Sequence, residues 1–286
     1  MKNKILRITT AVALISVFAV FSIESMSWPS VNASLLRNFG SNDRGMPVLG
    51  MIFSGGTEVL AAESGEVIFS RSKNDPASRL PSPFGSWTAL DHGDGLISVY
   101  SRYAEHEIPF TQTRVEKQTP IALSGISGWS LQNGFYFMLF DRRERRWINP
   151  AMIITPIQET RPPQIISVDL RNQQGVVMQS RNLTQGRYTV VVNAAGAGMQ
   201  QYAQQRIVCL INGAEVSSLN FEAVSARDGT LMVSRNGLVS ARQIYSGYPS
   251  FEAAEVFLTR GQVTLEIIVQ DISGANRSVV NRLIVN

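Results

Sequence analysis

Short apolar runs divided by turn residues dominate the sequence after residue 28. Typical runs are Glu66–Phe69, Leu96–Tyr100 and Phe135–Phe140, and each starts directly after a glycine. Short runs rich in β-branched and aromatic side chains, bounded by Gly, Pro, Asn or Asp, are typical of strands. No long segment keeps its apolar residues at the helical period of about 3.6. The sequence therefore predicts an all-β protein.

A boundary between two domains is expected at Pro162-Pro163. Two prolines remove two backbone donors and favour extended chain, which suits a linker over residues 158–163. About seven or eight strand-like runs, divided by turn pairs such as Asn212-Gly213, follow in residues 164–286. This pattern predicts an antiparallel β-sandwich of immunoglobulin-like type, although the Cys–Trp–Cys pattern of true immunoglobulin domains is absent.

The first 27 residues differ from the rest of the chain. Three basic residues lie within the first seven positions, an almost uncharged apolar run covers 8–23, and Ser25 and Ser27 follow. This is the layout of a secretory signal peptide. The run of about 16 residues is short for a bilayer span of roughly 20. We expect residues 1–27 to direct export to the periplasm or cell envelope, with cleavage near Ser25 or Ser27. An uncleaved N-terminal membrane anchor is the alternative.

Net charge and cysteine content argue against a nucleic-acid-binding protein and against a protein with a reactive thiol. The chain carries +4, and residues 1–27 hold three basic groups and Glu24, so removing their +2 leaves +2. This balance gives no reason to expect a nucleic-acid partner. Cys209 is the only cysteine and lies in the apolar run 206–211, where we expect a buried small hydrophobe rather than a reactive thiol.

Five motifs follow one another between Trp28 and Pro150. In chain order they are Trp28-Pro29 with Leu35–Gly40, Gly56–Val67, Gly85–Leu96, Val115–Gly128 and Asn149-Pro150. In this order and spacing they resemble the LytM-type M23 family of zinc peptidases, which cut cell-wall peptide bridges. Gly56–Val67 resembles the family's Gly-Thr-x-Val…Ala…Gly-x-Val hairpin, and Gly85–Leu96 is similar to its His-Gly-x-Gly turn. The resemblance implies that residues 28–157 fold as an M23-like antiparallel β domain.

The residues that the family uses around zinc are missing from this sequence. The family's His-x-x-x-Asp segment falls within Arg44–Phe53, which contains neither histidine nor aspartate. Its strand-end histidine is Arg102 here. Its His-x-His falls at Gly134-Phe135-Tyr136, with Phe137-Met138 next. A hydrolytic zinc holds about three protein ligands and a water whose pKa it lowers. The resemblance therefore implies a domain without catalytic residues, metal or cofactor.

Two histidines remain, and neither replaces the missing ligands. His92 matches the turn residue of the family, which is not a ligand, and polar residues beside glycines stabilise turns. His106 lies between Glu105 and Glu107. Adjacent residues rarely face one ion together. We expect a solvated loop there, with a metal site as the less favoured alternative.

The former zinc groove is the candidate binding site. An arginine would repel a cation, and its five fixed donors suit a carboxylate or a backbone carbonyl. Aromatic side chains could floor a groove for peptide or sugar. The competing interpretation places Arg102 in a surface ion pair and the aromatic rings in the core. The candidate groove residues are Arg102, Tyr100, Trp129, Tyr136 and Met138.

The run Asp141–Trp147 is the densest cluster of charge in the sequence. A basic hairpin tip there could meet an anionic wall polymer or lipid headgroups. A solvated tip with Trp147 packed beneath it is the simpler expectation.

Three functions follow from the resemblance. The first is a non-catalytic envelope protein that binds and regulates a cell-wall hydrolase through its degenerate groove. The second is a peptidoglycan-binding or structural envelope module. The third, least favoured, is an active peptidase with unusual ligands. Membrane contact is expected only through an uncleaved N-terminal segment.

Overall fold

A computed structural model describes residues 26–71, 80–104, 113–154, 163–195, 204–245, 247 and 249–286. Within these ranges the only helical elements are the four-residue α1 (Ala241–Ile244) and the 3-10 turn η2 (Pro150–Met152). The all-β prediction is confirmed. The described helices are too short and too polar to cross a bilayer. Residues 1–25 lie outside the described ranges, so the signal-peptide interpretation stays a prediction.

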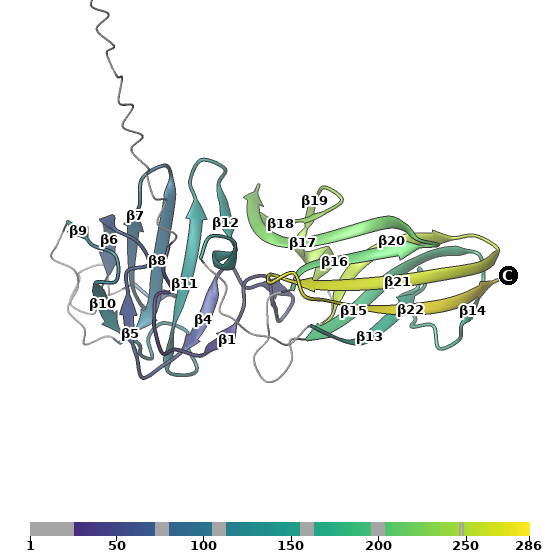
Figure 1. The fold of residues 1–286 in the computed structure, drawn as a ribbon, viewed down its shortest axis with the longest axis horizontal. Coiled ribbons are helices and arrows are strands. Elements are labelled where there is room, and N and C mark those ends of the chain that lie inside the picture. The colour runs from purple at the N-terminus through teal and green to yellow at the C-terminus, as the bar shows by residue number, and fades with distance from the viewer. Residues whose placement is uncertain are drawn as a thin grey trace, which may run out of the picture.

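The N-terminal half is a strongly bent set of antiparallel strands, seen at the left of Figure 1. Its strands are β1 (Leu35–Arg37), β2 (Asn42–Asp43), β3 (Met46–Pro47), β4 (Met51–Ser54), β5 (Glu58–Leu60), β6 (Gly65–Arg71), β7 (Ser86–Asp91), β8 (Leu96–Tyr103), β9 (Arg114–Val115), β10 (Pro120–Leu123), β11 (Gly134–Asp141) and β12 (Arg146–Ile148). The main sheet of this half runs β12-β11-β8-β7-β6-β9, with β4 also paired to β11.

Strand β11 lies at the centre of this half and is covered on both faces. Its first six residues are all buried. Phe135, Phe137 and Leu139 face the larger apolar core, whereas Tyr136 and Met138 point to the other face. A strand buried on both faces reads as a continuous apolar run, because neither face needs polar side chains. This explains the unbroken apolar sequence after Gly134.

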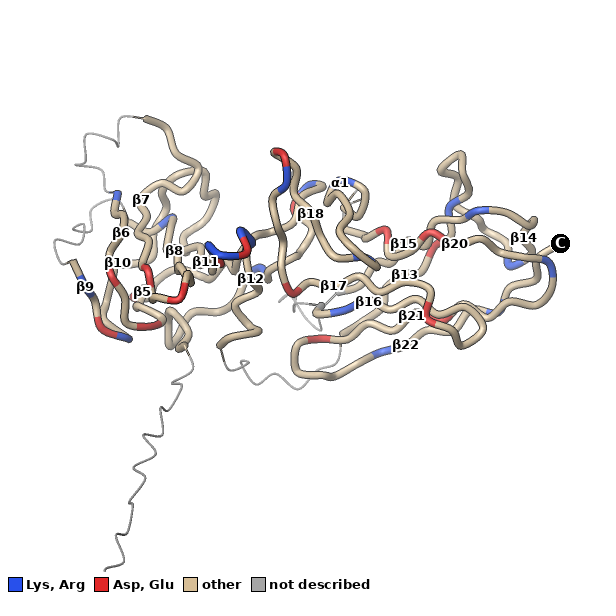
Figure 2. Tube along the Cα trace, turned by 90° about the horizontal axis from the view of Figure 1, so that it is seen from above, with Lys and Arg blue, Asp and Glu red and all other residues tan. Residues whose placement is uncertain are grey.

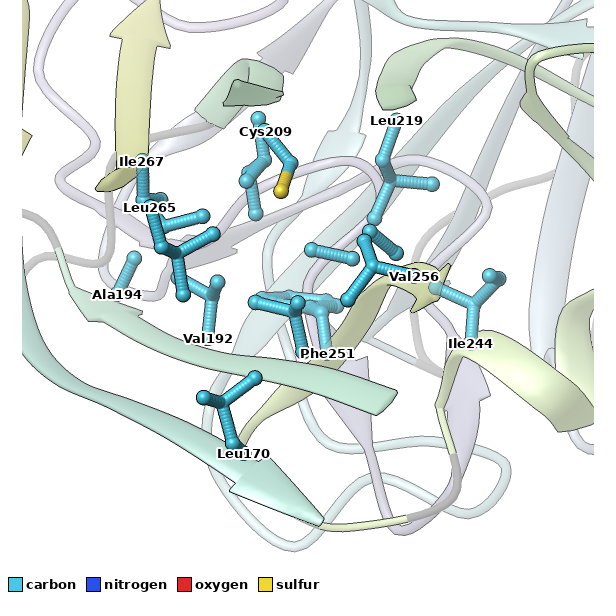
Figure 3. Packing of buried hydrophobic residues seen from close by; sticks show 14 of the residues in the cluster. Leu170, Val192, Ala194, Cys209, Leu219, Ile244, Phe251, Val256, Leu265 and Ile267 are labelled. Carbon is cyan, nitrogen blue, oxygen red and sulfur yellow. The ribbon is translucent and has the colours of Figure 1, made fainter. Parts of the chain in front are cut away.

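The C-terminal half consists of two packed sheets. Its strands are β13 (Gln164–Arg171), β14 (Asn182–Leu183), β15 (Gly186–Ala195), β16 (Gln204–Ile211), β17 (Ala214–Arg227), β18 (Thr230–Arg235), β19 (Leu238–Ser240), β20 (Phe251–Leu258), β21 (Gly261–Asp271) and β22 (Asn276–Val285). One sheet has the order β13-β15-β20, and the other includes β14-β22-β21-β16-β17. Their apolar faces meet in one core, where Val192, Leu265 and Phe251 lie together (Figure 3). The structure shows a β-sandwich, and its immunoglobulin likeness stays a prediction.

The two halves share one continuous sheet. Trp147 of β12 pairs with Val224 of β17, which joins the strands of both halves edge to edge (Figure 1). Asn149 is completely buried at this junction, where its side-chain amide donates to the Phe221 carbonyl over 3.1 Å. Phe39, from the N-terminal half, is buried in the core of the sandwich. The halves are therefore joined by packing and sheet pairing and not by a linker alone.

Candidate functional site

Arg102 projects from an irregularity near the end of β8. Ser86 pairs with Tyr103 and Trp87 pairs with Ser101, so Arg102 is an extra residue without an opposite partner on β7. Its φ is 66°, in the left-handed region that non-glycine residues rarely adopt. Such bulges re-aim a side chain and are common beside functional sites. The backbone N–H of Arg102 donates to the Phe84 carbonyl over 2.9 Å, which fixes the bulge.

The bulge directs the Arg102 guanidinium onto the ring of Tyr136. The guanidinium carbon lies 5.0 Å from the ring centre, within the range of a cation–π contact. The Nε of Arg102 is buried and has no hydrogen-bond partner among the described residues. The Tyr136 hydroxyl accepts a hydrogen bond from the Leu49 N–H over 2.9 Å. Burial raises the pKa of the Tyr136 hydroxyl, so this group stays neutral.

Gly50 packs directly against β11 beside this pair. A Cβ at Gly50 would lie 2.2 Å from the Phe137 carbonyl oxygen and 2.5 Å from Cγ of Met138. Both distances are far below ordinary contact, so no side chain fits at position 50 without movement of the backbone. Val48, Tyr136 and Met138 form a buried apolar cluster around this point.

Most of the N-terminal half of the chain matches a known protein family. The family model of Peptidase family M23 matches residues 49–150. A second family model matches residues 162–286, so another domain follows the M23-like domain. No curated protein matches the chain.

Solved structures of M23 proteins are similar to the chain at low identity. The catalytic domain of the prophage-encoded M23 protein EnpA from Enterococcus faecalis is 17% identical, covers 43% of this chain and 94% of its own, and has a TM-score of 0.35. Lysostaphin from Staphylococcus simulans is 15% identical, covers 88% of this chain and 87% of its own, and has a TM-score of 0.36. A chain of the SpoIIQ–SpoIIIAH pore-forming complex is 19% identical, covers 46% of this chain and 92% of its own, and has a TM-score of 0.37.

The residues of this groove do not fit the zinc ion that the family implies. Within the described ranges, no three His, Cys, Asp or Glu side chains gather as a metal site would require. The groups around Tyr136 are its own phenol, which is hydrogen-bonded to backbone, the Arg102 guanidinium and the Met138 thioether. Gly50, beside them, has no room for a side chain. A buried cation there would meet a positive charge and apolar walls, which disfavour it. These side chains therefore support no chemical step through a metal.

The structure divides the predicted groove residues into three groups. Arg102 lies over the Tyr136 ring, and Tyr136 and Met138 belong to one buried apolar cluster, with 7% and 3% exposure. Tyr100 has no exposed surface, and its hydroxyl accepts a hydrogen bond from the Ala62 N–H in the core. This burial corrects the expectation that Tyr100 lines the groove. Trp129 is 73% exposed on the loop before β11.

Sequence patterns did not identify Gly50 as a groove residue. The register of Arg44–Phe53 depends on the pairing of β4 with β11, in which Met51 lies opposite Phe137. A signal was present, because an isolated glycine beside a strand often marks close backbone approach. The exposed apolar residues Ile126 and Leu131, which flank Trp129, were also missed.

His92 belongs to a hydrogen-bonded turn rather than to the groove. Its Nδ1 lies 2.9 Å from the Ser64 carbonyl, which can only accept, so Nδ1 carries the proton of the neutral ring. Its Nε2 lies 2.7 Å from the Ser98 hydroxyl. Desolvation lowers the pKa of His92, which favours this neutral form. His106 and its acidic neighbours lie outside the described residues.

The lone cysteine and the basic hairpin tip both have structural surroundings. Cys209 is fully buried in the sandwich core, and burial raises the pKa of its thiol to about 12. Figure 2 shows basic residues gathered at the tip between β11 and β12. Arg143 there pairs with Asp94 over 3.0 Å, and Trp147 packs against the sandwich core. The tip is a charged surface above the domain junction.

Proposed function

We propose that this protein is an exported, non-catalytic M23-domain protein that binds a cell-envelope protein, a cell-wall hydrolase, through the altered groove and regulates it. The observation that carries the proposal is the arginine bulge: Arg102 stands over Tyr136 at a position where the resemblance to the M23 family implies a histidine. A directed cation in place of a metal ligand is suited to binding rather than to hydrolysis. The hydrolase partner is implied by resemblance to non-catalytic relatives of the family.

The chemistry of the groove supports recognition of a protein partner. The Nε–H of Arg102 lacks an acceptor among the described residues, and a buried unpaired donor is costly. Arg102 as a whole is partly exposed, so a carboxylate or backbone carbonyl of a partner would accept from the terminal nitrogens of its guanidinium. Arg102 and Trp129 both donate their backbone N–H groups to the segment Pro83-Phe84, at 2.9 and 3.2 Å. The backbones that carry the cation and the exposed aromatic ring are therefore anchored to the same short segment, and arginine and tryptophan are common in the hot spots of protein interfaces.

The test is capture from an envelope extract with Arg102→Glu. We expect this variant to lose partner capture and to keep its melting temperature, because the side chain is partly exposed and its Nε–H has no acceptor among the described residues. Arg260→Glu, a change of the same charge at an exposed site on the sandwich, should capture normally. The captured fraction should release dye from labelled cell wall, whereas the protein alone should neither clear wall nor retain zinc. Equal capture by both variants would refute the role of the groove.

Peptidoglycan binding is the second candidate function. The large exposed ring of Trp129 favours it, because exposed aromatic faces stack on sugar and peptide. Sedimentation of the purified protein with isolated cell wall separates the two functions. Strong binding without any protein partner, lost in Trp129→Ala, would favour the wall-binding function over the regulatory one.

A further inference from the structure

The sandwich has an open seam between its two sheets on the side of β13 and β22. An open slot of about 590 Å³ lies there, lined by Gln164 and Ile165 of β13 and by Asn276–Val279 of β22. β13 pairs with β15, and β22 pairs with β21 and, at Ile284 and Val285, with β14. Beside the slot itself, no strand among the described residues pairs with the other edge of β13 or of β22.

The chain itself fills the other end of this seam with an extended segment. The Met178 N–H donates to the Leu170 carbonyl of β13, and the Ile284 N–H of β22 donates to the Arg181 carbonyl. Met178 packs against the sandwich core and Leu183 is buried in it. The seam is thus built to accept an extended strand that hydrogen-bonds to an edge and inserts apolar side chains. Among the described residues, the part of the seam beside Gln164, Ile165 and Asn276–Val279 is left open.

The free edge of β22 is ready to pair with such a strand. β21 and β22 pair without a register shift from Asn276 to Val285. Successive N–H groups of β22 therefore point alternately toward β21 and away from it. Because the N–H of Ile284 points to the outer edge, those of Ser278, Val280 and Arg282 point there too. Among the described residues no partner is seen for these three groups.

The side chains that face the slot define what would fill it. On the inward face of β22, Leu283 and Val285 are buried at 5% and 3%, whereas Val279 is only partly covered and Arg277 is exposed. Ile165 of β13 is also only partly covered although it touches the core. An apolar side chain would cover Val279 and Ile165, and an acidic one two positions away would reach Arg277.

We propose that this seam is a second binding site, which takes an extended peptide segment of a partner protein by strand addition to β22. The segment carries an apolar residue and an acidic residue two positions apart. Its backbone pairs with Ser278, Val280 and Arg282, and its side chains close the uncovered part of the core. A second copy of the same edge is a poor occupant, because β22 carries Arg277 and Arg282 and no acidic residue.

The experiment uses synthetic peptides with the sequence of the chain's own seam-filling segment, residues 176–183. One peptide carries Ser180→Glu and its matched control carries Ser180→Lys, since Ser180 lies two positions from Met178. We expect the acidic peptide to bind the full chain roughly threefold or more tightly than the basic one, the difference expected for a surface ion pair. It should slow hydrogen exchange at the amides of Ser278, Val280 and Arg282, followed residue by residue by NMR.

Val280→Pro provides the decisive variant. It removes an N–H that points away from β21, which an edge strand tolerates, so the sandwich should keep its melting temperature and lose peptide binding. Val280→Thr keeps the N–H and should bind as the parent does. The proposal is overturned by an absence of amide protection with the acidic peptide, by undiminished binding to Val280→Pro, or by a chain that dimerises alone with these amides already protected. Arg102→Glu should leave peptide binding unchanged, so this site and the M23 groove are tested separately.

Discussion

Adding one methyl group at Gly50 tests whether the Phe137 carbonyl closes position 50 to any side chain. The Cβ of Gly50→Ala would lie 2.2 Å from the Phe137 carbonyl oxygen, whereas ordinary contact begins at 3.4 Å. The two backbones must therefore separate by about 1.2 Å, the difference between 3.4 and 2.2 Å. The Met138 side chain can turn away, but the carbonyl belongs to a strand paired with β4 and β8 and cannot.

The expected cost follows from this forced separation. Overpacking of a tight core costs about 1–3 kcal/mol, and a backbone contact belongs at the upper end, at about 3 kcal/mol. For a chain of this size the melting temperature should fall by roughly 6–12 °C, at about 2–4 °C per kcal/mol. Thermal and urea unfolding of parent and variant measure both quantities. Met138→Ala added to Gly50→Ala should restore none of the loss, because the carbonyl contact remains and Met138 is itself buried.

Gly186→Ala is the matched control for this experiment. A Cβ at Gly186 would have no other atom within 4 Å, and the φ of Gly186 is not in the left-handed region. That change should be neutral or stabilise by up to about 1 kcal/mol, because it restricts the unfolded chain. If Gly50→Ala unfolds within about 0.5 kcal/mol of Gly186→Ala, position 50 has room for a side chain.

Two further changes test the domain junction and the turn at His92. Asn149→Asp removes the amide that donates to the Phe221 carbonyl and buries a carboxylate beside that oxygen. We expect the free energy of unfolding in urea to fall by about 2–4 kcal/mol at pH 7. The loss should be smaller at low pH, where the protonated acid can donate a hydrogen bond. Equal stability of variant and parent at both pH values would contradict this. His92 has a lowered pKa in the folded state, so the unfolded chain binds more protons below pH 6.5 and stability should fall as pH decreases through that value. His92→Gln should weaken this dependence between pH 7.5 and 5.5 in urea unfolding, and an unchanged dependence would show that His92 does not contribute to it.

Local chemistry explains which features the sequence could predict. Strand positions follow from alternation of side chains and from turn residues, which act over a few positions, so β6, β8 and β11 were expected where they occur. The replacement of the histidines and aspartate of the family motifs is equally local, because it is a matter of which residue stands at each motif position. The resemblance to M23 proteins, confirmed over residues 49–150, rests on short motifs of this kind.

Register and long-range pairing explain what could not be predicted. Tyr100 and Tyr136 both lie in aromatic strands, but pairing of β8 with β11 sends Tyr100 into the core and leaves Tyr136 under Arg102. A shift of one residue would exchange the two faces, and sequence alone does not set that shift.

The sequence by itself determined the strands and the order of the two domains, since each depends on residue type and near neighbours. Only the tertiary structure decided that Arg102 bulges onto Tyr136, that Gly50 is closed by the Phe137 carbonyl, and that the two halves share one sheet. These features arise where segments far apart in the chain meet, and the backbone geometry at such meetings is set by the whole fold.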